Sequence, residues 1–139
     1  MPLLNYTTKV DIFTTIGQIQ GILVKHGAKR IVQDYRGESV TALCFVIDTP
    51  IGEQAVRLPA NVKAVQDTLQ KQKVKADYAQ AERVAWRIVK DWVEAQMAIL
   101  ESGMVKLDQI FLPYIMDSDG RTVYELYESK QLLLSGGKE

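Results

Sequence analysis

The chain has 139 residues, 47% of them hydrophobic and 24% charged, so it can bury a core and is too apolar to be disordered throughout. Its single cysteine excludes an intramolecular disulfide, and no apolar run approaches the length of a membrane span. These features predict a single domain, residues 1–139, in a reducing cytoplasm.

The net charge is zero, but the charges are unevenly distributed along the chain. Residues 1–90 hold 13 Lys and Arg against 8 Asp and Glu, a net charge of +5, whereas residues 91–139 hold 4 against 9, a net charge of −5. Such an asymmetry can mark a nucleic-acid face and an acidic, partner-facing surface. Alternatively, the two halves neutralise each other in the fold.

The N-terminal part predicts a strand followed by a helix. Residues 3–10 have the alternating pattern of a strand. Asp11 is a suitable N-cap for a helix that continues to His26, and Gly27 occupies the position of a left-handed C-terminal cap. The apolar side chains that repeat at helical spacing between them are Ile12, Ile16, Ile19 and Leu23.

Three further strands are predicted. Residues 29–35 lead into a hairpin turn at residues 36–38. Residues 40–47 are almost continuously apolar, which predicts a central strand buried on both faces or nearly so. After a turn that contains Pro and Gly, residues 54–58 form the next strand.

Two helices follow these strands. Asn61 is a suitable N-cap for a helix that ends at about Lys73, and residues 77–102 form a longer helix. The apolar side chains of the longer helix cover an arc of roughly 220°, about twice the width of an amphipathic stripe. This helix must therefore be covered on two sides, by a sheet and another helix or by a second chain. Its apolar arc consists of Val84, Ala95, Ile88, Ala81, Ile99, Trp92, Ala85, Val89, Leu100, Val93, Trp86 and Met97.

The C-terminal part predicts two short helices and a tail. Residues 107–112 form a short helical turn that Pro113 stops. Thr122 has the spacing of a capping box for a helix over residues 123–133. Residues 135–139 are expected to fray.

This order of elements predicts an α+β fold with a small, largely antiparallel sheet (β-α-β-β-β) and helices packed on one face. Residues 1–60 form the sheet together with a helix that crosses over it, and residues 61–134 form the helical part. The long central helix lies between the sheet and the C-terminal helices.

No catalytic, metal-binding or nucleotide-binding motif is found in the sequence. His26 is the only histidine, and no serine lies in a G-x-S-x-G turn. Cys44 lies inside the most apolar strand, where it is expected to be a core residue with a raised pKa and little nucleophilicity. One Cys and one His cannot form a structural zinc site, and the turn from Asp117 to Gly120 lacks the final glutamate of a calcium loop. We therefore predict no catalytic residue, no metal, no cofactor and no enzyme activity.

A basic group with one tyrosine is the first candidate binding site. Arg83, Arg87 and Lys90 share one face of the long helix. The group could follow a phosphate backbone, with Tyr78 as a stacking platform, or acidic residues one helical turn further on could neutralise it. Its members are Lys71, Lys73, Lys75, Tyr78, Arg83, Arg87 and Lys90.

An aromatic and acidic group in the C-terminal region is the second candidate binding site. Large apolar side chains surrounded by carboxylates are typical of a surface for a protein partner or for a homodimer. Alternatively, these side chains cover the exposed half of the long helix. The members are Phe111, Tyr114, Met116, Asp117, Asp119, Tyr124, Glu125, Tyr127 and Glu128.

Four stretches resemble a family of small proteins from phages and prophages of Gram-positive bacteria: LLNYTTKV (3–10), RVAWRIVKDWVEAQMAILESGMV (83–105), FLPYIM (111–116) and DGRTVYELY (119–127). The resemblance covers nearly the whole chain and carries no catalytic residue over. It implies an accessory protein in the cytoplasm of a bacterial host. Phage proteins of this size often inhibit host nucleases and other defence systems, and others assist replication or recombination.

Two functions follow as hypotheses. The first is a non-catalytic, phage-derived binding protein that acts by protein–protein interaction and inhibits a host defence or nucleic-acid-processing complex. The alternative is a nucleic-acid-binding accessory protein in phage replication or recombination. The first would use the aromatic and acidic group, and the second would use the basic group.

Overall fold

The computed structural model describes residues 2–129 and has an α+β architecture. Four antiparallel strands form one sheet in the order β1-β2-β3-β4. The elements are α1 (Ile12–Lys25), β1 (Arg30–Arg36), β2 (Ser39–Thr49), β3 (Gly52–Arg57), α2 (Val62–Lys71), α3 (Tyr78–Glu101), α4 (Leu107–Phe111), the 3-10 turn η1 (Leu112–Tyr114), β4 (Ile115–Met116) and α5 (Val123–Glu128). Within residues 2–129, no helix is both long and apolar enough to cross a membrane.

The N-terminal segment differs from the prediction, because residues 3–10 contain a turn at residues 4–7 and no strand. This segment lies against α3 and pairs with no strand of the described part. The side-chain amide of Asn5 donates to Asp91 over 2.8 Å, and the side-chain amide of Gln80 donates to the Tyr6 and Thr8 carbonyls. The predicted order β-α-β-β-β is therefore wrong: α1 precedes every strand of the sheet and does not cross over between two of them.

The sheet buries only one of its two faces. Phe45 pairs with Val56, Val56 pairs with Ile115, and all three side chains are buried on the face toward the helices. On the opposite face Cys44 is half-buried and Val32 is 53% exposed. The prediction that residues 40–47 are buried on both faces or nearly so is therefore confirmed for one face only: Leu43, Phe45 and Ile47 are buried, whereas Ala42, Cys44 and Val46 on the other face are half-buried.

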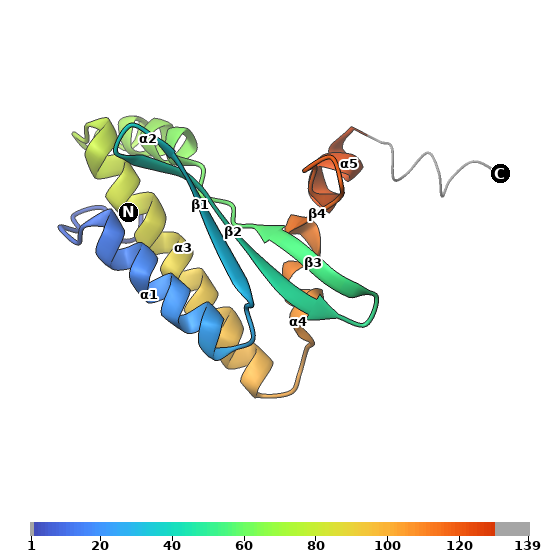
Figure 1. The fold of residues 1–139 in the computed structure, drawn as a ribbon. Coiled ribbons are helices and arrows are strands. Elements are labelled where there is room, and N and C mark those ends of the chain that lie inside the picture. The colour runs from blue at the N-terminus through green and yellow to red at the C-terminus, as the bar shows by residue number, and fades with distance from the viewer. Residues whose placement is uncertain (1, 130–139) are drawn as a thin grey trace.

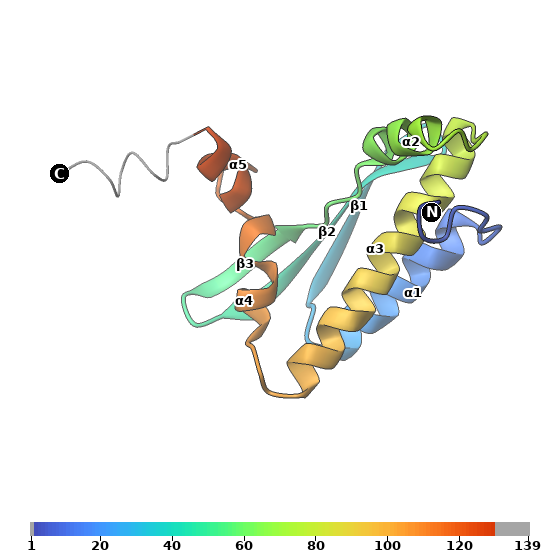
Figure 2. The same ribbon diagram turned by 180° about the vertical axis from the view of Figure 1, so that it is seen from behind.

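The long helix is covered on two sides, as the sequence predicts, but α1 and α2 are its main helical neighbours, so the prediction that it lies between the sheet and the C-terminal helices is wrong. Figures 1 and 2 show α1 and α3 side by side along the sheet, with α2 near the start of α3. Trp86 and Val93 of α3 share the main core with the sheet and α1, whereas Ala81 and Ala85 form a small second cluster with Val62 of α2. Ala95, which the predicted arc included, is exposed.

The helix ends confirm the cap assignments. The side chains of the predicted N-caps Asp11 and Asn61 accept backbone N–H groups at the starts of α1 and α2, and Asp77, which was not predicted as a cap, does the same at the start of α3. Gly27 follows α1 with φ +105°, a backbone conformation that favours glycine. The helix predicted over 123–133 is observed as Val123–Glu128; residues 130–133 and the predicted tail, 135–139, lie outside the described residues.

His26 joins the C-terminal ends of α1 and α3. Its Nδ1 lies 2.8 Å from the Ile22 carbonyl oxygen, and its Nε2 lies 2.8 Å from a carboxylate oxygen of Glu101. Both partners are acceptors, so both ring nitrogens donate only when the imidazole is protonated. The Ile22 carbonyl, and after it the Glu101 carboxylate, therefore raises the pKa of His26 above its ordinary value.

We expect this contact to make stability depend on pH. Because the folded-state pKa is raised, the protonated form of His26 stabilises the folded protein. This contribution is fully present below the ordinary imidazole pKa of about 6.5 and is lost as pH rises through the folded-state pKa. Urea unfolding from about pH 5 to about pH 9 should therefore show a decline that the His26→Gln variant lacks. An NMR titration of this single histidine gives its pKa directly, and a pKa at or below about 6.5 would contradict the argument.

Glu82 is a buried acidic residue on the inner side of α3. It is 7% exposed, and its Oε2 has no hydrogen-bond partner among the described residues. The same is true of Nε1 of Trp86, one helical turn further on. An unpaired carboxylate in this position is costly, because burial removes its water without supplying a donor.

Replacing this carboxylate should stabilise the fold. We expect Glu82→Met to raise the free energy of unfolding by about 1–3 kcal/mol, measured by urea denaturation. Glu94→Met is the matched control on an exposed face of the same helix, and it should change stability by less than about 1 kcal/mol. A destabilised Glu82→Met protein would show that the carboxylate has a stabilising partner.

Candidate functional site: a tyrosine-lined cleft

An open cleft of about 730 Å³ lies between the sheet, the start of α2 and the C-terminal segment. Three tyrosines from separate elements line it: Tyr78 begins α3, Tyr114 ends η1, and Tyr124 lies in α5. One wall is formed by residues 57–63, where the chain leaves β3 and enters α2. The cleft therefore joins segments that are far apart in the sequence.

The floor of the cleft includes an unpaired part of β2. The pairing of β2 with β3 runs only from Cys44 to Thr49, and the Leu58 N–H adds one further bond to the Leu43 carbonyl over 3.0 Å. The chain then turns away at Pro59. On this side of β2, residues 39–42 have no strand partner within the described part, and Val40, Thr41 and Ala42 line the cleft.

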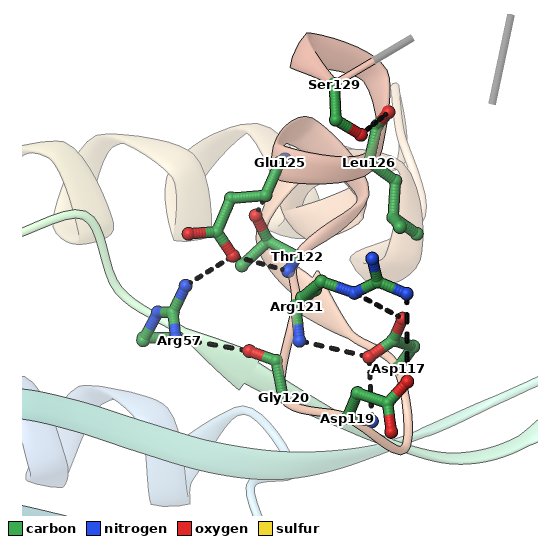
Figure 3. Close-up of polar contacts among 9 residues, drawn as sticks. All are labelled: Arg57, Asp117, Asp119, Gly120, Arg121, Thr122, Glu125, Leu126 and Ser129. Carbon is green, nitrogen blue, oxygen red and sulfur yellow. Dashed lines mark hydrogen bonds and ion pairs between the residues drawn. The ribbon is translucent and has the colours of Figure 1, made fainter. Parts of the chain in front are cut away.

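Arg57, the last residue of β3, links β3 to α5 and to the loop before it, which form the opposite wall of the cleft (Figure 3). Its guanidinium donates to Glu125 of α5 over 2.7 Å and to the Gly120 carbonyl over 3.2 Å. Glu125 also accepts the backbone N–H of Thr122 in a capping box at the start of α5. The Thr122 N–H first, and the Arg57 charge in addition, lowers the pKa of Glu125 below its ordinary value.

The loop before α5 is held by its own acidic residue, as Figure 3 also shows. One oxygen of Asp117 accepts the backbone N–H groups of Asp119 and Arg121, and these bonds, with that of Arg121 the largest cause, lower the pKa of Asp117. The carboxylate therefore has a structural role in the turn. Across residues 2–129, no group of three or more His, Cys, Asp or Glu side chains could hold a metal ion.

Equal numbers of basic and acidic side chains line the cleft, but not all of them form ion pairs. Arg57 pairs with Glu125, and Lys63 pairs with Asp67 over 2.8 Å. Glu128, at the end of α5, lines the cleft and has no ion-pair partner among the described residues. The unpaired charge of the cleft is therefore negative.

The structure divides the predicted aromatic and acidic group. Tyr114, Tyr124, Glu125 and Glu128 line the large cleft. Met116 and Asp117 line a smaller, mostly apolar cleft of about 280 Å³ beside the β2–β3 turn. The remaining members are Phe111, which is fully buried in the core, and Asp119 and Tyr127, which are exposed outside both clefts.

The basic group is also divided. Arg83 donates to Gln80, Arg87 donates to Thr15 and Gln18 of α1, and Lys90 pairs with Glu94 over 3.2 Å. Arg87 therefore links α3 to α1, whereas Arg83 and Lys90 bond to neighbouring side chains within α3. Tyr78 belongs to the cleft. The three lysines at the end of α2 and in the connection to α3 are exposed and form no ion pair with the described residues; they are Lys71, Lys73 and Lys75.

Cys44 lies outside the core, contrary to the prediction. It is half-buried on the open face of the sheet, where burial first, and the Asp34 charge in addition, raises the pKa of its thiol. The direction of this shift is as predicted and leaves the thiol protonated and weakly nucleophilic. His26, the only candidate base of its type in the chain, is bonded at the far end of α1.

Comparisons with known proteins found no relative: no family model matches the chain, and no similar curated protein or solved structure was found.

The sequence did not reveal the contribution of Thr41, Arg57 or Lys63 to the cleft. Pro59, which ends the pairing of β3, was the one signal for the break in the sheet. The site is therefore defined by geometry alone.

Proposed function

We propose that the protein is a non-catalytic binding protein that contacts a protein partner through the tyrosine-lined cleft. One observation carries the proposal: tyrosines from α3, η1 and α5 converge on an open cleft of about 730 Å³. Tyrosine combines a large apolar ring with a hydroxyl group and is enriched at protein interfaces. The cleft is also large enough to enclose several side chains of a partner.

The resemblance to phage and prophage proteins supplies a class of partner for this proposal. A host defence or nucleic-acid-processing complex is the target that such an accessory protein would inhibit. Both ring nitrogens of His26 are engaged in hydrogen bonds, and the raised pKa of Cys44 keeps its thiol protonated. These features support a binding role over a catalytic one.

Site-specific cross-linking tests the proposal. A photoreactive p-benzoylphenylalanine replaces Tyr124 in the cleft or, as the control, Phe13 on α1; these side chains are similarly exposed, at 51% and 49%. Irradiation in a lysate of a Gram-positive host should give a discrete product from position 124 alone. A product of twice the monomer mass would identify a second copy as the partner. Identical products from both positions, or none, would reject the cleft as the binding site.

Nucleic-acid binding is the second candidate function, because Lys71, Lys73 and Lys75 are exposed and unpaired within the described part. It predicts binding to single- or double-stranded DNA that weakens steeply between about 50 and 200 mM salt. Replacing all three lysines by Ala should then remove the binding. Absent or salt-independent binding would exclude this candidate.

A further inference from the structure

We propose that the cleft binds an extended peptide segment of the partner, which pairs as an additional strand with β2 at residues 39–42 and directs a basic side chain toward Glu128. The inference rests on the proposed function and deepens it. It specifies the conformation and the charge of the segment that is bound.

The backbone of β2 supplies the first argument. A strand without a neighbour presents N–H and C=O groups that another extended chain can pair with. Residues 39–42 of β2 lack such a neighbour on the cleft side among the described strands, because the pairing with β3 begins at Cys44. The bound segment would extend the line of β3 past the point where the chain turns away.

The chain that leaves β3 at Pro59 does not itself pair with residues 39–42 of β2. Pro59 has no N–H to donate. The Ala60 N–H donates to the Leu58 carbonyl over 3.0 Å, and the Asn61 N–H donates to the Pro59 carbonyl over 3.2 Å. These two donors of the connection therefore bond within it and not to residues 39–42 of β2.

The walls of the cleft define the side chains of the segment. Tyr78, Tyr114 and Tyr124 offer rings to alternate side chains of an extended peptide. Arg57 and Lys63 already have acidic partners, whereas Glu128 has none among the described residues. Charge complementarity therefore calls for a Lys or Arg in the bound segment.

Other occupants fit this geometry less well. A helix satisfies its own backbone groups and would leave those of β2 unpaired. A phosphate backbone would meet the unpaired carboxylate of Glu128 and no unpaired cation among the charged residues that line the cleft. An extended, basic peptide satisfies both the strand and the charge.

Peptide selection provides the test. A displayed library of random dodecapeptides is selected against the full-length protein, and the bound sequences are made as fluorescent peptides for polarisation measurements. Enriched peptides should contain a Lys or Arg among β-branched or aromatic residues. The Tyr124→Ala variant should weaken their binding, because the ring lines the cleft. Failure to enrich any peptide, or equal binding by Tyr124→Ala, would overturn the proposal.

Methylation of single backbone amides distinguishes strand pairing from other modes of binding. Only every second N–H of an added strand faces its neighbour. Methylating those amides should weaken binding about tenfold or more, whereas methylating the intervening amides should have little effect. Uniform tolerance or uniform loss along the peptide would overturn the proposal.

The charge of the cleft is tested separately. Glu128 is exposed, so its variants should fold normally, which an unchanged melting temperature would verify. Glu128→Gln should weaken a basic peptide about two- to fivefold, and Glu128→Lys should weaken it further. Unchanged binding by both variants would reject the charge assignment. A cross-link from position 124 without alternating methylation effects would retain the proposed function and reject strand pairing, whereas the absence of any cross-link would reject the function itself.

Discussion

Changing Val89 to Asp should lower the free energy of unfolding by about 4–5 kcal/mol and leave little folded protein. Val89 is 6% exposed and belongs to the main core, which is shared by α1, α3, α4 and the inner face of the sheet. The substitution removes packed methyl groups and places a carboxylate where no cation is available in that core. Urea unfolding followed by tryptophan fluorescence measures the loss.

Ala95→Asp is the matched control for this prediction. Ala95 lies on the same helix and is exposed, so it should show only the lower helix propensity of Asp, a loss of about 0.5–1 kcal/mol. A soluble Val89→Asp protein with the unfolding midpoint of the wild type would contradict the enclosed position of α3.

Changing Phe111 to Ala should cost about 3–5 kcal/mol. Phe111 is completely buried, and its ring lies edge-on to Phe45 and Trp92, with centroid distances of 5.1 and 5.8 Å. These contacts fix α4 between the sheet and α3, so the variant leaves a cavity and loses two aromatic pairs. The emission of Trp92 should also change, because its neighbour is removed.

Leu112→Ala provides the control at the adjacent position. Leu112 is 52% exposed, so its truncation should cost less than about 1 kcal/mol. Equal losses at positions 111 and 112 would show that the C-terminal segment is not anchored through Phe111. A binding assay on the Leu112→Ala protein should give the affinity of the wild type, because this residue does not line the large cleft.

The helical part of the fold is predictable from the sequence because its signals are local. Asp11, Asn61 and Thr122 mark helix starts by cap chemistry that involves only the next few residues. The apolar arc of the long helix likewise requires two covering layers, wherever those layers come from. Both features are encoded within a few turns of chain and are found where they are expected.

The errors arise where tertiary contacts outweigh local patterns. Residues 3–10 alternate as a strand does, but Asn5 and the neighbouring carbonyls bond to α3 and not to a sheet. The strand β4 has two residues and exists only because Met116 pairs with Ala55 and Ile115 pairs with Val56. Such a short element has no periodicity that a sequence pattern could reveal.

The cleft was only partly predictable for the same reason. Its tyrosines were recognisable as binding residues, but they were assigned to two different groups, Tyr78 to the basic one and Tyr124 to the aromatic one. Their convergence depends on the residue at which β3 leaves the sheet and on the contact of Arg57 with Glu125, 68 positions away in the sequence. Neither is a property of any single segment.

The outer strand β1 bears on how the protein behaves when copies are crowded together. Its outer side pairs with no strand in residues 2–129, and unprotected strands of this kind promote aggregation. At an irregularity opposite Asp34 and Tyr35, β2 has one extra residue, Thr41, which increases the local twist of the pair. Two copies paired antiparallel about Gln33 would also place Arg30 of each opposite Arg36 of the other, at both ends of the shared ladder. These features of β1 disfavour edge-to-edge pairing between copies of the protein. Residues 39–42 of β2, by contrast, have no strand partner on the cleft side within the described part.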